Sequence, residues 1–167
     1  ILSSAFHPSA MIIDVVVAST SRFRRYGSVR SPEEADDLSG QVILERIKAA
    51  GHTARYSLLP DGLGLRQAAE KSDADAIIVC GGTGLTKSDL TLEALEPLFE
   101  KSLPGFGEIF RYRSLEDVGT RAILTRAAAG VYRGLPIFCL PGSPGAARVG
   151  MDLILPELGH IIRHIRE

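Results

Sequence analysis

The chain has 167 residues, of which 45% are hydrophobic and 23% charged, and its formal net charge is −1. This length suits one domain with a single core, and the composition excludes a largely disordered chain. The near-neutral charge argues against a nucleic-acid or acidic-membrane partner, because such a partner requires a basic surface. An anionic ligand would therefore have to be held by a local site.

Residues 1–10 precede the first strand-like segment, and we interpret them as an N-terminal extension to one domain over residues 11–167. They lack the basic start and the apolar core of a signal peptide. No apolar run in the sequence reaches the roughly 20 residues that span a bilayer. Cys80 and Cys139 each end an apolar run, as small buried residues do, so we expect both to be reduced and the protein to be cytoplasmic.

Strand-like and helix-like segments alternate in the first part of the chain. In order, we expect a strand at 11–18, a helix at 32–50, a strand at 52–59, a helix at 63–71 and a strand at 74–80. The first and third strands are short apolar runs with β-branched residues, and the helices show apolar residues at helical spacing.

The second half continues this alternation. In order, we expect a helix at 92–101, a polar region of short helices at 104–130, a strand at 135–140 and a helical pattern from 144 onward. Pro156 interrupts the last pattern, which predicts two helices or one kinked helix. The whole order predicts a single-domain, three-layer α/β/α sandwich with a mainly parallel sheet.

In such a sheet, ligands bind beyond the carboxyl ends of the strands. The loops expected there are residues 60–62, 81–91 and 141–145. The second of them holds three glycines in four positions, within VCGGTGLTKSDLT at 79–91. This loop is not a P-loop, because Thr86 stands where that motif has its second glycine, and Lys87 likewise breaks the dinucleotide-binding pattern.

Backbone amides in a glycine-rich turn can bind an anion even without these motifs. The structural alternative is that the glycines only turn a strand into a helix, whose cap would be Asp89 or Thr91.

Four separate blocks of sequence resemble the MoaB/MogA family of molybdenum-cofactor biosynthesis proteins. They are CGGTGLTKSDLTLEAL (80–95), PGFGEIFRYRS (104–114), ILTRAAAG (123–130) and LPGSPGA (140–146). The resemblance extends from about Ile12 to the C-terminus. It implies a molybdopterin adenylyltransferase that converts molybdopterin and Mg-ATP to adenylyl-molybdopterin and pyrophosphate. It also implies the three-layer fold, a homotrimer or homohexamer, and the downstream metal-insertion enzyme as a further partner.

The resemblance assigns roles to individual residues. The molybdopterin or phosphate site would comprise Gly81, Gly82, Thr83, Gly84, Lys87, Glu108, Gly142 and Ser143. Asp61 and Asp89 would match the two functionally important aspartates, and we expect them to be catalytic and to hold Mg²⁺, which prefers hard oxygen ligands. Lys87, Arg111 and Arg113 suit contacts with phosphate groups.

Several of these residues also have structural interpretations. Asp61 stands in Pro60-Asp61-Gly62, a strong turn signal, and Asp89 is a candidate helix cap. Ser143 before Pro144 is predicted to cap the helix that follows, a role compatible with anion binding.

Two further polar groups lie outside the matched blocks. We expect Arg22-Phe23-Arg24-Arg25 to be a solvated loop, with a phosphate or oxyanion contact as the alternative. His160 and His164 stand one helical turn apart but have no evident third metal ligand, so we expect surface or interface histidines.

Three positions differ from the common family pattern. Ser21 ends a segment in which an acidic residue is frequent, Ser88 replaces an arginine, and Leu92 replaces a proline. A catalytically inactive paralogue that binds molybdopterin or a partner enzyme is therefore the alternative function. A third possibility is a structural oligomer in which the glycine loop serves only the fold. Assembly in multiples of three is expected from the resemblance and from the apolar run Leu153, Leu155, Leu158, Ile161 and Ile165.

Overall fold

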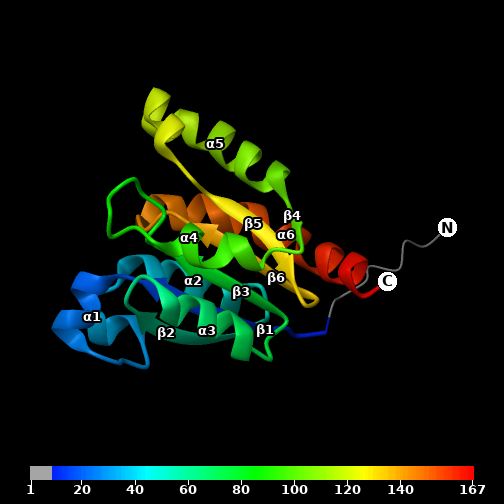
Figure 1. The fold of residues 1–167 in the computed structure, drawn as a ribbon. Coiled ribbons are helices and arrows are strands. Elements are labelled where there is room, and N and C mark those ends of the chain that lie inside the picture. The colour runs from blue at the N-terminus through cyan, green and yellow to red at the C-terminus, as the bar shows by residue number, and fades with distance from the viewer. Residues whose placement is uncertain (1–8) are drawn as a thin grey trace.

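The computed structural model describes residues 9–167, so residues 1–8 of the expected N-terminal extension lie outside the described part. Within it, one six-stranded sheet has the strand order β2-β1-β3-β6-β5-β4 (Figure 1). The parallel strands are β1 (Ile12–Ala18), β2 (Thr53–Leu59), β3 (Ala76–Cys80) and β6 (Leu135–Leu140). The antiparallel edge consists of β4 (Lys101–Ser102) and β5 (Ala128–Tyr132). The predicted mainly parallel sheet is confirmed.

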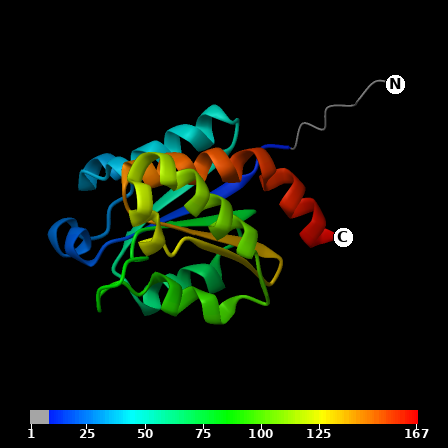
Figure 2. The same ribbon diagram turned by 90° about the horizontal axis from the view of Figure 1, so that it is seen from above.

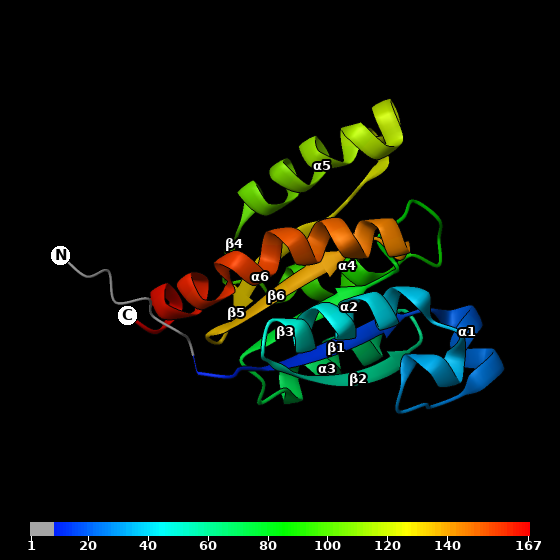
Figure 3. The same cartoon turned by 180° about the vertical axis from the view of Figure 1, so that it is seen from behind.

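Helices cover both faces of the sheet, as Figure 2 shows from above. One face carries α2 (Leu38–Ala49) and α6 (Pro144–Arg166), which lie in front of the strands in Figure 3, and α5 (Pro104–Val118), which lies above them in that view. The other face carries α3 (Leu63–Lys71) and α4 (Thr91–Leu95). Alternate residues of β1 enter the two cores, Val15 and Val17 one of them and Val16 the other. The three-layer prediction is confirmed.

Residues 20–26 form a helix, α1 (Thr20–Tyr26), where we expected a solvated loop. Ser19 explains its start, because the Ser19 side chain accepts a hydrogen bond from the Arg22 amide as an N-cap. The expected helix at 32–50 is in fact a 3-10 turn at Pro32–Ala35 followed by α2. The break falls at Asp36, which adopts a left-handed conformation, and Asp37 then caps α2.

The region 92–130 differs most from the sequence prediction. The helix expected at 92–101 is limited to α4 and a 3-10 turn at Glu96–Leu98. The short helices expected at 104–130 are one 15-residue helix, a 3-10 turn and strand β5.

A tight turn at Arg133-Gly134, with both residues at positive φ, joins β5 to β6. The Phe99 ring lies where a Cβ on Gly130 would stand, 2.3 Å away, so a small residue is required in β5.

The C-terminal segment is one helix, α6, that continues through Pro156. Leu158 is fully buried in the core, and Leu153, Leu155 and Ile161 pack against it. Most of the apolar run expected to support assembly is therefore used within the fold. None of the helices described for residues 9–167 combines the length and apolarity required to cross a membrane.

Both cysteines are free and buried, as predicted. Cys80 ends β3, Cys139 lies in the neighbouring β6, and burial raises the pKa of the Cys80 thiol to about 12. Its Sγ donates to the carbonyl oxygen of Pro141 at 3.4 Å.

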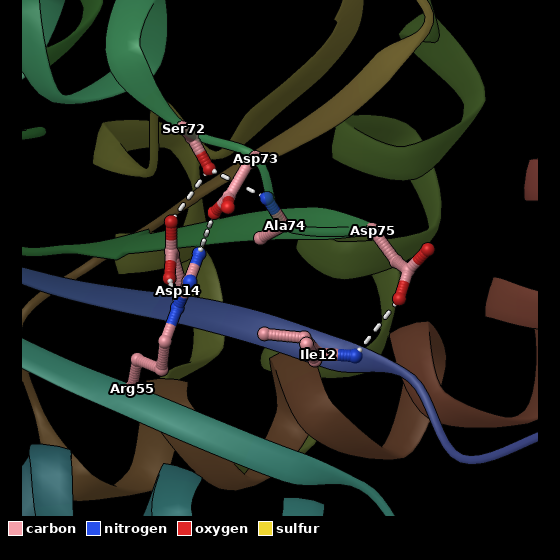
Figure 4. A network of polar contacts seen from close by, with 7 residues as sticks. All are labelled: Ile12, Asp14, Arg55, Ser72, Asp73, Ala74 and Asp75. Atoms are coloured by element: carbon pink, nitrogen blue, oxygen red, sulfur yellow. Dashed lines mark hydrogen bonds and ion pairs between the residues drawn. The ribbon is translucent and has the colours of Figure 1, made fainter.

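A polar network closes the amino-terminal end of the first three strands (Figure 4). Arg55 on β2 binds Asp14 on β1 at 2.6 Å and Asp73 before β3 at 2.7 Å. Ser72 donates to the other oxygen of Asp14 at 2.5 Å, and Asp75 accepts from the Ile12 amide at 2.9 Å. Helix α3 ends next to this point, so side-chain pairs rather than a helix cover Asp14.

Candidate functional site

A cavity of about 860 Å³ lies at the carboxyl ends of β1, β3 and β6, where the sequence predicted ligand binding. Its walls are formed by residues of 17–26, 36–37, 80–84, 124–125 and 141–143, together with Asp89. The glycine loop and the loop after β6 thus face one space, and α1 adds a third wall.

The first two glycines of the loop are required by its backbone. Gly81 has φ +104° and Gly82 has φ +65°, conformations that other residues rarely adopt. A Cβ on Gly81 would lie 2.3 Å from the Ala18 carbonyl oxygen, and one on Gly82 would lie 2.1 Å from Asp61 Oδ1. Both glycines therefore allow close packing against neighbouring segments as well as the turn.

Four successive carbonyl groups of the loop are each bound by the protein. Thr91 takes the first two, with its hydroxyl donating to Gly81 O at 2.7 Å and its amide donating to Gly82 O at 3.0 Å. Arg126 takes the next two, with Nε donating to Thr83 O at 3.0 Å and Nη2 donating to Gly84 O at 2.7 Å. These bonds fix the peptide planes of the loop.

The amides of the loop are used differently from its carbonyls. The Gly81 amide donates to Leu140 O at 2.9 Å, and Gly84 packs against the Asp89 carboxylate, 2.6 Å from Oδ2 to where a Cβ on Gly84 would stand. The amides of Gly82 and Thr83 donate no hydrogen bond to any residue in 9–167. The nest available to an anion is therefore this pair, narrower than the expected four amides.

Asp89 lines the cavity beside the loop. Its Oδ2 accepts from the Thr86 amide at 2.9 Å and from the Thr86 hydroxyl at 2.6 Å. The Thr86 hydroxyl, followed by backbone amides and Arg126, holds the pKa of this carboxyl below its ordinary value. Leu90, and not Asp89, is the N-cap of α4, and it forms no side-chain cap bond, so the helix-cap interpretation of Asp89 was wrong.

Asp61 lies behind the loop and is not part of the cavity wall. One oxygen, Oδ2, accepts from the Thr20 hydroxyl at 2.9 Å, and the Thr20 hydroxyl in turn accepts from the Asp61 amide at 3.1 Å. The other oxygen, Oδ1, is buried and accepts no hydrogen bond within the described residues. An unpartnered buried acceptor of this kind fits a cation or a water molecule.

Each of the two carboxylates is by itself a ligand type that suits Mg²⁺, the cofactor that the family resemblance implies, but only Asp89 lines the cavity. Mg²⁺ commonly takes one or two protein carboxylates and completes its shell with water and substrate phosphates. Asp89 offers an ionised group at the cavity, and Asp61 offers a buried oxygen without a donor. Residues 9–167 contain no group of three or more metal-ligating side chains.

The other expected site residues divide between two cavities. Gly142 and Ser143 line the main cavity, and Ser143 caps α6 by accepting from the Ala146 amide at 3.1 Å, as predicted. Glu108 and Arg111 line a separate cavity of about 530 Å³ that shares Thr125 with the main one.

The other basic and histidine residues considered from the sequence, Lys87, Arg113, His160 and His164, have exposed side chains. Lys87 and Arg113 are exposed and line neither of these two cavities. His160 and His164 contact each other on the exposed side of α6, with 3.2 Å between their Nε2 atoms, as expected for surface histidines.

The sequence analysis did not assign several cavity residues to the site, and it considered Arg22 only in the alternative of a phosphate or oxyanion contact. Arg22 lines the cavity and donates to Ala35 O at 2.8 Å, and Tyr26 donates to the Asp36 carboxylate at 2.5 Å. Asp37 is buried, caps α2 through the Gly40 amide at 2.9 Å, and accepts from the Tyr56 hydroxyl at 2.7 Å.

Burial and the bond to Asp37 raise the pKa of Tyr56 far above its ordinary value. The Asp-x-x-Gly spacing before a helical pattern could have marked Asp37 as a cap, but nothing local marks it as part of a cavity.

Known proteins resemble both the sequence and the fold. The family model described as "Probable molybdopterin binding domain" matches residues 14–160. A molybdopterin adenylyltransferase of Pyrococcus furiosus is 42% identical over 143 residues, which cover 80% of this chain and 83% of the relative. Molybdenum cofactor biosynthesis protein B of Halalkalibacterium halodurans is 47% identical over 137 residues, with coverages of 77% and 81%.

A solved structure extends the likeness to three dimensions. The tungsten cofactor synthesizing protein MoaB from Pyrococcus furiosus superposes with a TM-score of 0.82 at 37% identity, over 96% of this chain and 99% of that one. The family match, the relatives and the fold agree. The chain belongs to the MoaB/MogA family of molybdenum-cofactor biosynthesis proteins, whose members include molybdopterin adenylyltransferases.

Proposed function

We propose that this protein is a molybdopterin adenylyltransferase, which uses Mg-ATP to adenylylate molybdopterin and releases pyrophosphate. The observation that carries the proposal is the glycine loop, in which all four carbonyls of residues 81–84 are bound by the protein and two amides remain to hold a phosphate. The cavity of about 860 Å³ is large enough for more than one small-molecule substrate. The named activity of the Pyrococcus furiosus relative supports the same reaction.

The reaction requires little covalent help from the protein. An oxygen of the molybdopterin phosphate attacks the α-phosphorus of ATP, a new P–O bond forms, and the bond to the β-phosphate bridging oxygen breaks as pyrophosphate leaves. Placement of the two anions and neutralisation of their charge supply most of the acceleration in such transfers. Bound Mg²⁺ would supply charge neutralisation, with Asp89 and Asp61 as the residues that hold it.

The walls of the cavity suggest which residues meet which part of the substrates. The amides of Gly82 and Thr83 would hold the pterin phosphate, close to the helix start at Ser143. Arg25 on α1 lines the cavity as an exposed cation and suits the ATP phosphates. Glu108 would meet the substrate only where it extends past Thr125 into the second cavity.

The direct test is to incubate the protein with molybdopterin, ATP and Mg²⁺ and to measure pyrophosphate and adenylyl-molybdopterin. We expect both products in equal amounts, and neither when the divalent cation is chelated. Saturable binding of molybdopterin without release of pyrophosphate would instead support the inactive paralogue. A cytoplasmic location and transfer of the product to a metal-insertion enzyme are part of the same proposal.

We also propose that the protein assembles in multiples of three. The support now comes from α5, whose outer side exposes Ile109, Tyr112, Leu115 and Val118 in a stripe at helical spacing. Light scattering of the native protein should give three or six chain masses, and Tyr112→Glu should lower that mass. A monomeric wild-type protein would contradict the proposal.

A further inference from the structure

Arg126 reaches the glycine loop from a distant part of the sequence. It precedes β5 and contacts residues 42 and 43 positions earlier, Gly84 and Thr83, through their carbonyl oxygens. Its third contact is with Glu93 on α4, at 2.7 Å. Arg126 does not line the main cavity, and at the second cavity, which it lines with Glu108, its guanidinium is taken up by the two loop carbonyls and Glu93.

The bonds to the loop carbonyls determine where the loop amides point. In a trans peptide unit the C=O and the following N–H point in opposite directions, and no cis bond occurs in residues 9–167. Thr91 holds Gly81 O and Gly82 O, and so orients the amides of Gly82 and Thr83. Arg126 holds Thr83 O and Gly84 O, and so fixes the Gly84 peptide, which lies against Asp89: a Cβ on Gly84 would stand 2.6 Å from Asp89 Oδ2.

Two residues, Thr91 and Arg126, therefore fix different parts of the glycine loop. Thr91 orients the pair of amides assigned to the substrate phosphate. Arg126 fixes the Gly84 peptide, against which the Asp89 carboxylate packs. A planar guanidinium can bind two carbonyls and a carboxylate at once, a geometry that lysine cannot reproduce.

We propose that Arg126 is a positioning residue for Asp89, acting through the Gly84 peptide, and that it serves turnover and not the binding of molybdopterin. This assignment rests on the proposed adenylyl transfer. Glu93 positions Arg126 in turn, because it pairs with the guanidinium from α4 at 2.7 Å.

The test compares Arg126→Gln with Arg66→Gln. Arg66 also pairs with a glutamate, Glu70 on α3 at 2.9 Å, but it does not contact the loop, so its variant controls for loss of an arginine–glutamate pair. We expect Arg126→Gln to lower kcat by about tenfold to a hundredfold, the scale of a misplaced catalytic group, and to change molybdopterin affinity by less than about threefold. Arg66→Gln should change neither quantity.

Two further measurements separate positioning from general damage. In a double-mutant cycle, Arg126→Gln should add little to the loss caused by Asp89→Asn, because both act through one carboxylate. Arg126→Lys should recover part of kcat, since it restores the charge and one bond, and it carries the test if Arg126→Gln does not fold. Unchanged kcat in a folded Arg126→Gln, or multiplicative losses with Asp89→Asn, would overturn the proposal.

A readout that needs no activity distinguishes this proposal from the proposed function. The NMR order parameter of the Gly84 amide should fall in Arg126→Gln, because this peptide loses the bonds that fix it, and should stay unchanged in Arg66→Gln. If the wild type never releases pyrophosphate but this fall is seen, the transfer reaction fails while the role of Arg126 in fixing the loop beside Asp89 stands. Absence of the fall overturns that role whether or not the protein is active.

Discussion

The two ends of the parallel sheet differ in whether their polar groups have hydrogen-bond or ion-pair partners. At the amino-terminal end, Asp14 and Asp73 are each bound by Arg55, and Asp14 also by Ser72. At the carboxyl end, the amides of Gly82 and Thr83 and the buried Oδ1 of Asp61 have no partner in residues 9–167. Because buried polar groups are normally satisfied, unpartnered groups concentrated at one end indicate where a ligand completes the structure.

Substitutions at the carboxyl end of the sheet should affect turnover far more than substitutions at the amino-terminal end. Asp89→Asn keeps the size of the side chain and an acceptor for Thr86 but removes the charge that would hold a cation. We expect transfer to fall by about a hundredfold or more, with near-normal molybdopterin affinity, as when an electrostatic group that acts in the transition state is lost. Asp61→Asn should behave similarly, with less than multiplicative losses in the double variant if both act through one ion. Full activity of Asp89→Asn in steady-state assays would remove Asp89 from the cation site.

A second test places a Cβ in the carboxyl-end loop. Gly82→Ala combines a positive φ with a contact at 2.1 Å to Asp61 Oδ1, whereas Gly51→Ala has φ +82° and no atom within 4 Å. Urea unfolding should show a loss of about 1 kcal/mol for Gly51→Ala and about 3 kcal/mol for Gly82→Ala, because only the latter adds overpacking to backbone strain. Only Gly82→Ala should also weaken molybdopterin binding. Equal losses of stability would mean that Asp61 does not pack against the glycine.

A third test removes the ion pairs at the amino-terminal end of the sheet. Arg55→Gln removes both ion pairs of a partly exposed arginine, and we expect a loss of about 1 kcal/mol in unfolding free energy, the upper range for exposed pairs. Transfer and molybdopterin affinity should be unchanged, since the network is at the opposite end of the strands. A change in turnover without a change in stability would show that the two ends are coupled.

The smallest expected effect is in the pH dependence of stability. Hydrogen bonding and charge from Arg55 lower the pKa of Asp73, so its contribution is present above the ordinary aspartate pKa and is lost as pH falls through the depressed value. Asp73→Asn should therefore flatten slightly the fall of unfolding free energy at acid pH. Because Asp73 is exposed, molar salt should remove most of the difference between variant and wild type.

The strands that the sequence predicted well are those whose residues must be apolar on both faces. Residues 76–80 and 135–140 are buried throughout, so an apolar run is the only pattern available to them. Strand β5 was missed because the residues Ala128-Ala129-Gly130 have small side chains and lack the β-branched or aromatic pattern of a strand. The glycine is required because the Phe99 ring, from another part of the sequence, occupies the space of its Cβ.

The site was predictable to the extent that it depends on local backbone. The glycine loop, Ser143 and the edge of the sheet follow from local patterns, and the family resemblance adds Asp61, Asp89 and Glu108. The Arg126 bonds span more than 40 positions, and no spacing rule connects them to the loop. The placement of Glu108 in a second cavity likewise depends on how α5 packs against the sheet edge.

The buried thiol of Cys80 gives the molecule an internal reporter. Its raised pKa keeps it protonated at neutral pH, and because the side chain is fully buried at the wall of the cavity, it reacts with a thiol reagent only when the end of β3 opens locally. The next residue along the chain is the first glycine of the loop. A ligand held by that loop makes this opening rarer in proportion to its occupancy, and the rate of thiol labelling would then measure binding without any added probe.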